Sequence, residues 1–237
     1  NTYGSVNFVD PTGIQLVPNK TIIDAPASSA LAYINYQYKD DDMAQIEQTK
    51  KLPVTLLQDP VYLKRLDCLT TTLPEETKTV SVYSLGERDA LVWGNNKYLI
   101  LAPTILLKKG TTSENLSTEL LNHRLTLYYL SAEGDEDANT LKLYLRYEIS
   151  GIGGSSTEET DDKESWASDY NVRYTNVSHV NLQPIISMYK STHSGSEPEK
   201  VTVEYEYNNS TSSIPTIAKK QTKTVTYNLY TETSSNN

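Results

Sequence analysis

Alternation of apolar and polar residues is the dominant pattern of this sequence. It is clearest in residues 141–149 (LKLYLRYEI) and in residues 201–207 (VTVEYEY). Successive side chains leave a β-strand on opposite faces, so this alternation is typical of half-buried antiparallel strands. The pattern therefore predicts an all-β protein with little helix.

Short strands separated by turn residues are predicted in the first part of the chain. Residues 4–9 and 14–17 flank the sequence DPTG at 10–13, whose proline and glycine favour a tight hairpin. Residues 40–43 are predicted to form a polar loop. Further strands are predicted at residues 30–38, 45–49 and 52–57. Several short strands in about 70 residues suit a small OB-like barrel.

Longer strands are predicted in the second part. They cover residues 79–83, 90–93, 98–101, 125–130, 141–149, 201–207 and 222–230. The polar residues 131–140 are predicted to form a hairpin loop that joins two antiparallel strands. Only three stretches are compatible with helix: residues 113–123, residues 163–169, and a turn near residues 182–186.

The predicted domain organisation follows from these elements. Residues 1–72 form the OB-like β-barrel domain, residues 73–232 form a β-sandwich domain, and residues 233–237 are a disordered tail. The fold class is all-β, with a small N-terminal OB-like barrel followed by a β-sandwich.

Composition and charge narrow the possible functions. The chain of 237 residues has a net charge of −9. A phosphate-binding surface needs clustered lysine and arginine, so nucleic-acid binding is not expected. The 18 tyrosines, against one phenylalanine, suit strands with one face in water, because the ring packs while the hydroxyl is hydrated.

The single cysteine and the N-terminus bear on the cellular compartment. Cys68 has apolar neighbours, which favour a small buried hydrophobic side chain over a reactive thiol. No stretch approaches the roughly 20 apolar residues of a membrane helix, and the first residues do not form a signal peptide. A chain that starts at Asn1 without methionine is expected for an exported protein that has lost an upstream segment.

No residue pattern matches a known catalytic or cofactor site. His123, His179 and His193 lie far apart, whereas local zinc motifs place their ligands within about five residues of one another. The sequence has no Gly-x-Ser-x-Gly elbow, and the glycines of residues 151–154 lack the spacing of a dinucleotide loop. We therefore predict no catalytic residues, no cofactor, and a flexible linker at 151–163.

One segment resembles the start of a calcium-binding loop. Asp135, Asp137 and Asn139 place oxygen-bearing side chains at alternate positions. Thr140 stands where such a loop has glycine, and Arg146 stands where it has a carboxylate. A solvated hairpin tip is the favoured interpretation, and metal binding by these three residues is the alternative.

Aromatic residues provide the candidate ligand-binding set. Trp93 lies in a predicted strand and is expected in the core. Trp166 lies in the polar run 163–169, where burial is difficult, so it is the better candidate for a binding surface. Trp166, Tyr170 and Tyr174 are the predicted ligand-binding residues.

The order of several segments resembles a known family. These segments are residues 4–9 (GSVNFV), 14–18 (IQLVP), 32–38 (AYINYQY) and 93–100 (WGNNKYLI). Together they resemble the NigD-like lipoproteins of Bacteroidetes, in which a small OB-like domain precedes a β-sandwich. Lys97 is an insertion relative to the family's Asn-Tyr-Leu segment, and residues 151–163 lengthen the sandwich.

This resemblance implies a location but no activity. Members are exported through a lipoprotein signal, with a lipidated cysteine upstream of a polar tether. The expected location is therefore the cell envelope, with the membrane reached only through a removed N-terminal lipid anchor at the outer membrane. No catalytic residues are implied by the resemblance.

The function predicted from the sequence is a non-catalytic, monomeric binding or interaction module that recognises a protein or a glycan. A carbohydrate-active enzyme is one alternative, and it would need two carboxylates roughly 5–10 Å apart in a cleft. A fimbrial or assembly subunit is the other, and it would donate the C-terminal strand, residues 225–230, to the sheet edge of a partner.

Overall fold

The computed structural model describes residues 7–22, 31–131, 139–153, 165–208 and 215–229. It divides into two compact units. The N-terminal unit comprises Asn1–Arg65 with Trp93–Asn95, and the C-terminal unit comprises Leu66–Val92 and Asn96–Asn237. The domain boundary after residue 72 stays a prediction.

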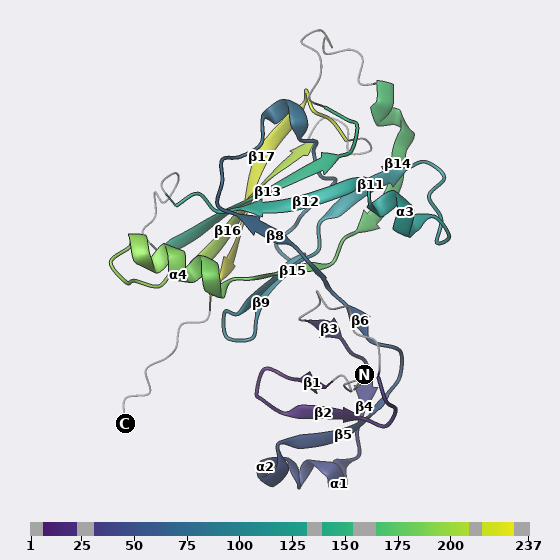
Figure 1. The fold of residues 1–237 in the computed structure, drawn as a ribbon, viewed down its shortest axis with the longest axis vertical. Coiled ribbons are helices and arrows are strands. Elements are labelled where there is room, and N and C mark those ends of the chain that lie inside the picture. Colours follow the sequence, from purple (N-terminus) through teal and green to yellow (C-terminus); the bar gives the residue numbers. More distant parts are fainter. Residues whose placement is uncertain (1–6, 23–30, 132–138, 154–164, 209–214, 230–237) are drawn as a thin grey trace, which may run out of the picture. The chain divides into compact units, whose positions relative to one another are not determined.

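The described residues of the N-terminal unit form a four-stranded sheet and a separate strand pair (Figure 1). The sheet has the order β1-β2-β5-β4, in which β2 and β5 are parallel and the other two pairs are antiparallel. Strands β3 and β6 form the separate antiparallel pair. The elements are β1 (Phe8–Val9), β2 (Gln15–Pro18), β3 (Ala32–Tyr33), β4 (Tyr36–Gln37), α1 (Asp40–Met43), α2 (Ile46–Thr49), β5 (Lys51–Leu56), β6 (Val61–Tyr62) and β7 (Lys64–Arg65). Closure into an OB-like barrel stays a prediction.

Two predicted elements of this unit are wrong. The expected polar loop at residues 40–43 is helix α1, because three acidic side chains in its first turn are stabilised by the partial positive charge of a helix N-terminus. The expected strand at 45–49 is helix α2, which buries Ile46 and ends at Lys50 in the left-handed conformation, with φ 52°. The predicted strand 30–38 is divided into β3 and β4.

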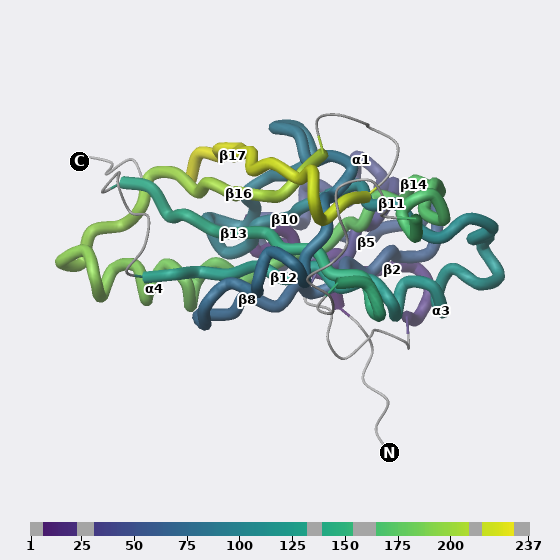
Figure 2. Tube along the Cα trace, turned by 90° about the horizontal axis from the view of Figure 1, so that it is seen from above, coloured from purple at the N-terminus to yellow at the C-terminus, as the bar shows by residue number. Residues whose placement is uncertain are grey.

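The C-terminal unit is built on a five-stranded sheet with the order β17-β16-β13-β12-β8 (Figure 2). The β12–β13 and β16–β17 pairs are antiparallel, whereas β13–β16 and β8–β12 are parallel, which alternation alone did not predict. Strands β9, β10 and β15 are neighbours in a second sheet, and β11 pairs with β14.

The bounds of the elements from residue 66 onward are as follows. The strands are β8 (Asp67–Leu69), β9 (Ala90–Trp93), β10 (Tyr98–Leu101), β11 (Thr104–Lys108), β12 (His123–Tyr128), β13 (Thr140–Ile149), β14 (Tyr170–Thr175), β15 (Ser178–Asn181), β16 (Lys200–Asn208) and β17 (Lys220–Asn228). The helices are η1 (Glu76–Lys78), α3 (Leu116–Leu120), η2 (Ser165–Asp169) and α4 (Gln183–Thr192).

A single apolar cluster joins the two layers of this unit. Leu143 of β13 and Val203 of β16 are fully buried and belong to the same cluster as Leu99 of β10 and Ile105 of β11. Residues from two sheets therefore share one core, which is the packing of a β-sandwich. The predicted all-β fold class is confirmed.

Helix α4 is longer than the turn predicted near residues 182–186. Ile185, Ile186 and Tyr189 are buried, and their spacing places them on one side of a helix. Pro184 stands in the first turn, where its missing N–H has no helical partner to lose. The helix therefore forms because it covers part of the sandwich core.

Residues 79–83 were predicted as a strand, but their backbone N–H groups do not pair along a single neighbouring strand. The Val80 N–H donates to the Tyr147 carbonyl at 2.8 Å, the Ser81 N–H to Thr216 at 2.9 Å, and the Val82 N–H to Glu206 at 2.9 Å. Each donor has a partner in a different element, so this segment crosses the end of the sheet and ties several strands together.

Candidate functional site

A groove of about 370 Å³ lies on the N-terminal unit at the point where β4 separates from β5. It is lined by residues of β2, β4, β5 and α1, by Asn19 after β2, and by the two residues between β4 and α1. These residues are Val17, Asn19, Gln37, Tyr38, Lys39, Asp42, Pro53, Val54 and Thr55. The volume falls within the range of small-molecule binding sites.

Pro53 explains why β4 ends where the groove begins. Gln37 of β4 lies opposite Thr55, and the Leu57 N–H donates to the Asn35 carbonyl, so the next hydrogen-bonded pair of this ladder would be Lys39 and Pro53. Proline has no N–H to donate, and the ladder cannot continue there. Lys39 instead precedes the first turn of α1. The proline thus opens a gap between β5 and the departing chain.

The other side of β5 is unaffected by this proline. The Asn19 N–H donates to the Val54 carbonyl at 2.9 Å, so the parallel pairing with β2 uses a residue next to the proline. A proline can be tolerated in this strand because its missing donor faces the groove. The sequence feature that marks the site is therefore Pro53 within an otherwise regular strand, and it was missed by the sequence analysis.

The groove combines an aromatic ring with several polar side chains. Tyr38 is 46% exposed and Val17 is 39% exposed. Asn19, Gln37 and Lys39 are exposed, and Asp42 is half-buried. Within the described part of the chain, the side chains of these four polar residues form no hydrogen bond or ion pair, so their donors and acceptors are available to a ligand.

The aromatic residues predicted to bind a ligand lie in and next to β14, on the other unit. Trp166 packs edge-on against Tyr170, with ring centroids 6.0 Å apart and planes at 77°. Tyr170 is 8% exposed, while Trp166 and Tyr174 are half-buried and pack against the sandwich core. The structure brings Trp166 and Tyr170 together, and ligand binding by the three residues stays a prediction.

A buried polar cluster next to Tyr170 was also missed by sequence reasoning. His123 Nδ1 lies 2.5 Å from the Tyr147 hydroxyl, and His123 Nε2 lies 2.9 Å from Glu119 Oε1. The backbone N–H of Lys108 also donates to Glu119 Oε1, at 2.9 Å. Burial opposes ionisation of Glu119, but the hydrogen bonds from His123 and Lys108 bring its pKa below the ordinary value. This cluster ties α3 to β11, β12 and β13.

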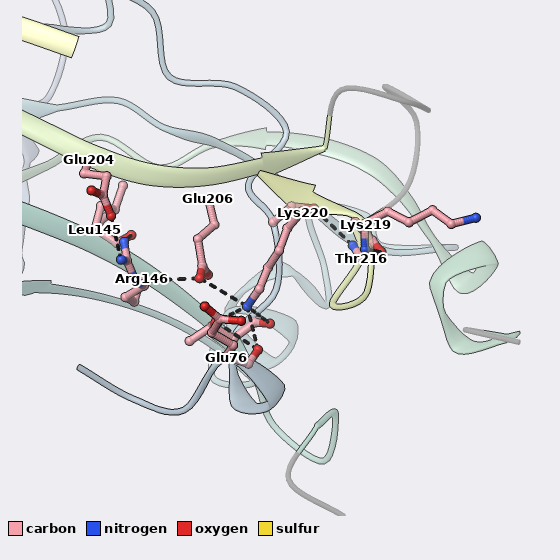
Figure 3. A network of polar contacts seen from close by, with 10 residues as sticks. Glu76, Leu145, Arg146, Glu204, Glu206, Thr216, Lys219 and Lys220 are labelled. Atoms are coloured by element: carbon pink, nitrogen blue, oxygen red, sulfur yellow. Dashed lines mark hydrogen bonds and ion pairs between the residues drawn. The ribbon is translucent and has the colours of Figure 1, made fainter. Parts of the chain in front are cut away.

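Charged side chains alternate in sign across the face of the five-stranded sheet opposite the core (Figure 3). Lys142 lies 3.4 Å from Glu204, which lies 2.8 Å from Arg146. Glu206 lies 3.7 Å from Arg146 and 3.2 Å from Lys220. The side chains of Arg146, Glu206 and Lys220 are at most 8% exposed, so these charges are nearly removed from water.

The amino group of Lys220 is surrounded by oxygen atoms (Figure 3). It donates to the carbonyls of Glu76 at 2.6 Å and Thr79 at 2.9 Å, and also to the Thr79 hydroxyl. Burial lowers the pKa of Lys220, and the carboxylate of Glu206 opposes this shift. These bonds join η1 to β17, which indicates a structural role for the network.

The remaining predicted site residues do not form a described metal site. Asp135 and Asp137 lie outside the described residues, and Asn139 is exposed. In the parts of the chain that the structure describes, no group of three or more His, Cys, Asp or Glu residues could hold a metal ion. Cys68 is half-buried against the sandwich core, and burial raises the pKa of its thiol to about 12.

No helix in the described segments combines the length and apolar character needed to cross a membrane.

Comparisons with known proteins identify similar structures. No family model and no curated protein matches the chain. A crystal structure of a predicted lipoprotein from Bacteroides fragilis matches 97% of this chain and 94% of that chain, with a TM-score of 0.70 and 21% identity. An uncharacterized protein from Parabacteroides merdae matches 96% of this chain and 98% of that chain, with a TM-score of 0.53 and 14% identity.

Fold and groove together define a two-unit, β-rich protein with a surface groove on its smaller unit. A NigD-like immunity protein from Bacteroides caccae is also among the similar structures, with a TM-score of 0.49, 13% identity, and coverage of 92% of this chain and 87% of that chain. At the level of the fold, this chain is similar to a predicted lipoprotein of Bacteroides, in line with the resemblance seen in the sequence.

Proposed function

We propose that this chain is a non-catalytic binding module of the bacterial cell envelope and that the groove beside β5 is its ligand site. The observation that carries the proposal is the opening of this groove by Pro53, with exposed polar side chains around it. The fold shared with a predicted Bacteroides lipoprotein supports an envelope location. A lipid anchor upstream of the chain would hold the module at the outer membrane.

The groove favours a neutral ligand that carries hydroxyl groups. Lys39 and Asp42 contribute opposite charges, so the lining has no net charge to select an ion. Asn19, Gln37 and Thr55 supply hydrogen-bond donors and acceptors, and the exposed ring of Tyr38 supplies an apolar face. Sugars present both kinds of surface. The proposed ligand is therefore a saccharide unit of a glycan, in line with the glycan partner predicted from the sequence.

Binding of the purified chain to a glycan array, followed by calorimetry on the glycans that bind, tests this proposal. Tyr38→Ala removes the ring, and we expect it to weaken binding at least about tenfold, by loss of roughly 1.4 kcal/mol or more. Tyr33→Ala is the matched control, because Tyr33 is a 60% exposed tyrosine of the same unit that does not line the groove. Its binding should equal that of the wild type.

A second variant tests the origin of the groove. Pro53→Thr restores a backbone N–H opposite Lys39, so β4 can continue along β5 and occupy the groove. We expect folding to be retained and glycan binding to be lost. Binding that survives both groove variants would exclude the groove as the site, and its loss in Trp166→Ala would place the site on the C-terminal unit. No binding to any glycan would overturn the ligand class.

A further inference from the structure

Strand β17 forms a long edge of the five-stranded sheet. It pairs with β16 on one side over nine residues, from Lys220 opposite Asn208 to Asn228 opposite Lys200, without a shift in register. Within the described segments, no strand pairs with its other side. Strands in globular proteins usually have about five or six residues, so this is a long and regular edge.

The direction of the backbone groups along this edge is fixed by the pairing. The Leu229 N–H donates to the Glu199 carbonyl at 2.8 Å, so residues 229, 227, 225, 223 and 221 direct their backbone groups toward β16. The alternate residues Thr222, Thr224 and Thr226 therefore direct theirs away from the sheet. All three threonines are exposed. The edge thus presents donors and acceptors that another strand could pair with.

The usual devices that protect a strand edge are sparse here. β17 contains no proline and no bulge. The amino group of Lys220 is held in the buried network, so it does not project from the edge. Lys223 is the exposed charged residue within the strand. Proteins that avoid edge pairing commonly place prolines, bulges or several charges on such a strand.

The strand is complementary to a second copy of itself in the antiparallel direction. Its central residue, Thr224, directs its backbone outward, so a two-fold axis through Thr224 lets all nine residues pair. In that register Thr224 faces Thr224 of the second copy and Thr222 faces Thr226. Cross-strand threonine pairs are favourable. Lys223 faces Val225, so no lysine stands directly opposite another.

Charges near the two ends of the strand support the same register. Exposed Lys219 and Lys223 lie at its beginning. At its end, the Tyr227 hydroxyl donates to the Gly86 carbonyl at 3.2 Å, which brings a loop containing Glu87 and Asp89 to that side. Arg88 offsets part of this charge. An antiparallel second copy would place the lysines of each copy beside the acidic loop of the other.

We infer that β17 is a self-association edge through which two copies of this chain pair antiparallel and form one continuous sheet. This replaces the monomer expected from the sequence. The surface lies on the C-terminal unit and does not involve the groove residues, so the inference is independent of the proposed ligand site. An extended peptide from another protein is the other possible occupant of the edge.

Sedimentation equilibrium of the full chain tests the inference. One strand pair buries little surface, so we expect a reversible dimer that becomes detectable between about 10 and 500 µM. Thr224→Pro removes an outward N–H and places a ring on the edge, but it leaves every bond to β16. We expect its dimer to be at least about tenfold weaker, a loss of roughly 1.4 kcal/mol. Thr224→Val retains the N–H and should dimerise like the wild type.

A charge exchange identifies the register. Lys223→Glu and Glu87→Lys should each weaken the dimer, and the double variant should regain part of the loss. Circular dichroism and melting temperature check that every variant is folded. A wild type that remains monomeric over the whole range would overturn the inference, as would a dimer that Thr224→Pro leaves unchanged. A monomeric chain that captures an extended peptide at β17 would also overturn it.

Discussion

The two units of this protein differ in which residues they bury and which they expose to water. Among the described residues, the core of the N-terminal unit has five buried apolar residues, whereas that of the C-terminal unit has 30. Of the eleven large apolar side chains that are exposed in the described chain, seven belong to the N-terminal unit. The C-terminal unit, in contrast, buries charged residues such as Arg146 and Glu206.

This difference indicates that the C-terminal unit is a stable framework and that the N-terminal unit provides an accessible surface. In the C-terminal unit, polar groups are bonded to one another and hold η1 and the strands in one arrangement. In the N-terminal unit, the polar groups around the groove stay available, and apolar side chains stay in contact with water. The comparison predicts that substitutions in the polar networks of the C-terminal unit will change stability, whereas substitutions in the groove will change binding.

The largest effect is expected at the buried ammonium group. Lys220→Met removes the ammonium donor from the Thr79 carbonyl and leaves the Glu76 carbonyl with the 3.4 Å bonds from the Thr79 N–H and hydroxyl. It also leaves Glu206 with Arg146 alone, 3.7 Å away. Breaking a buried charge network by removing one partner costs about 3–5 kcal/mol in free energy of unfolding. Chemical denaturation measures this loss. Lys223→Met, at an exposed position of the same strand, should stay within about 0.5 kcal/mol of the wild type.

Equal free energies of unfolding for Lys220→Met and Lys223→Met would show that the network adds no stability. The contrast between the two units would then lose its main support.

The next effect concerns the glycines that were predicted to form a flexible linker. Gly153 has a φ of 84°, and a Cβ there would lie 2.3 Å from the carbonyl oxygen of Thr77 in η1. Gly151 has a similar φ of 79° but open space around it. Both alanine variants bear the cost of a left-handed residue, about 1–2 kcal/mol. Gly153→Ala should lose about 1–3 kcal/mol more by the clash.

Thermal unfolding of the two variants isolates the clash. If Gly151→Ala and Gly153→Ala melt at the same temperature, then η1 moves aside easily and is not held in place as the Lys220 contacts indicate.

A smaller and pH-dependent effect is expected at the Glu119 cluster. Glu119→Gln removes the charge that His123 and the Lys108 N–H contact, which should cost about 1–2 kcal/mol at pH 7. The pKa of Glu119 in the folded state is below its ordinary value of 4.5, so its contribution is present above that value and lost as pH falls through the folded pKa. The difference between variant and wild type should therefore shrink under acid.

Urea denaturation at pH 7 and at about pH 3 measures this change. Glu114→Gln is the control, because Glu114 is an exposed glutamate just before α3, the helix that carries Glu119. The stability difference between Glu119→Gln and the wild type could instead be the same at both pH values. That result would mean that the altered hydrogen-bond geometry, and not the lost charge, causes the effect.

The smallest effect on stability is expected in the N-terminal unit. Tyr38 and Met43 are 46% and 47% exposed, so Tyr38→Ala and Met43→Ala should change the free energy of unfolding by less than about 0.5 kcal/mol. Hydrogen exchange of the β5 amides reports on this unit separately. Faster exchange in either variant would show that these side chains support the fold instead of a binding surface.

The sequence predicted the long strands better than the short elements. Residues 141–149 and 201–207 form β13 and β16, and the loop between β12 and β13 joins an antiparallel pair as expected. The sequence of α4 carried a helical spacing of Ile185, Ile186 and Tyr189 that was taken for a turn. Helices α1 and α2 were missed because four residues are too few to show a period.

The candidate site depends on pairings that no local pattern reveals. The sequence shows a proline at position 53, but its consequence depends on Lys39 being the residue opposite to it. Glu119 and His123 are four residues apart, but Tyr147 comes from another strand. The aromatic residues near 166–174 were chosen because the local sequence is polar, although distant core residues pack against them.

The sequence by itself therefore determined the all-β class, the strands with strong alternation and the resemblance to NigD-like lipoproteins, because these depend on the order of side chains along one segment. Tertiary structure alone decided which strands run parallel, where β4 separates from β5, and which charges are buried. Lys220, Glu206 and Arg146 lie on three different strands, and only the register between those strands brings their charges together.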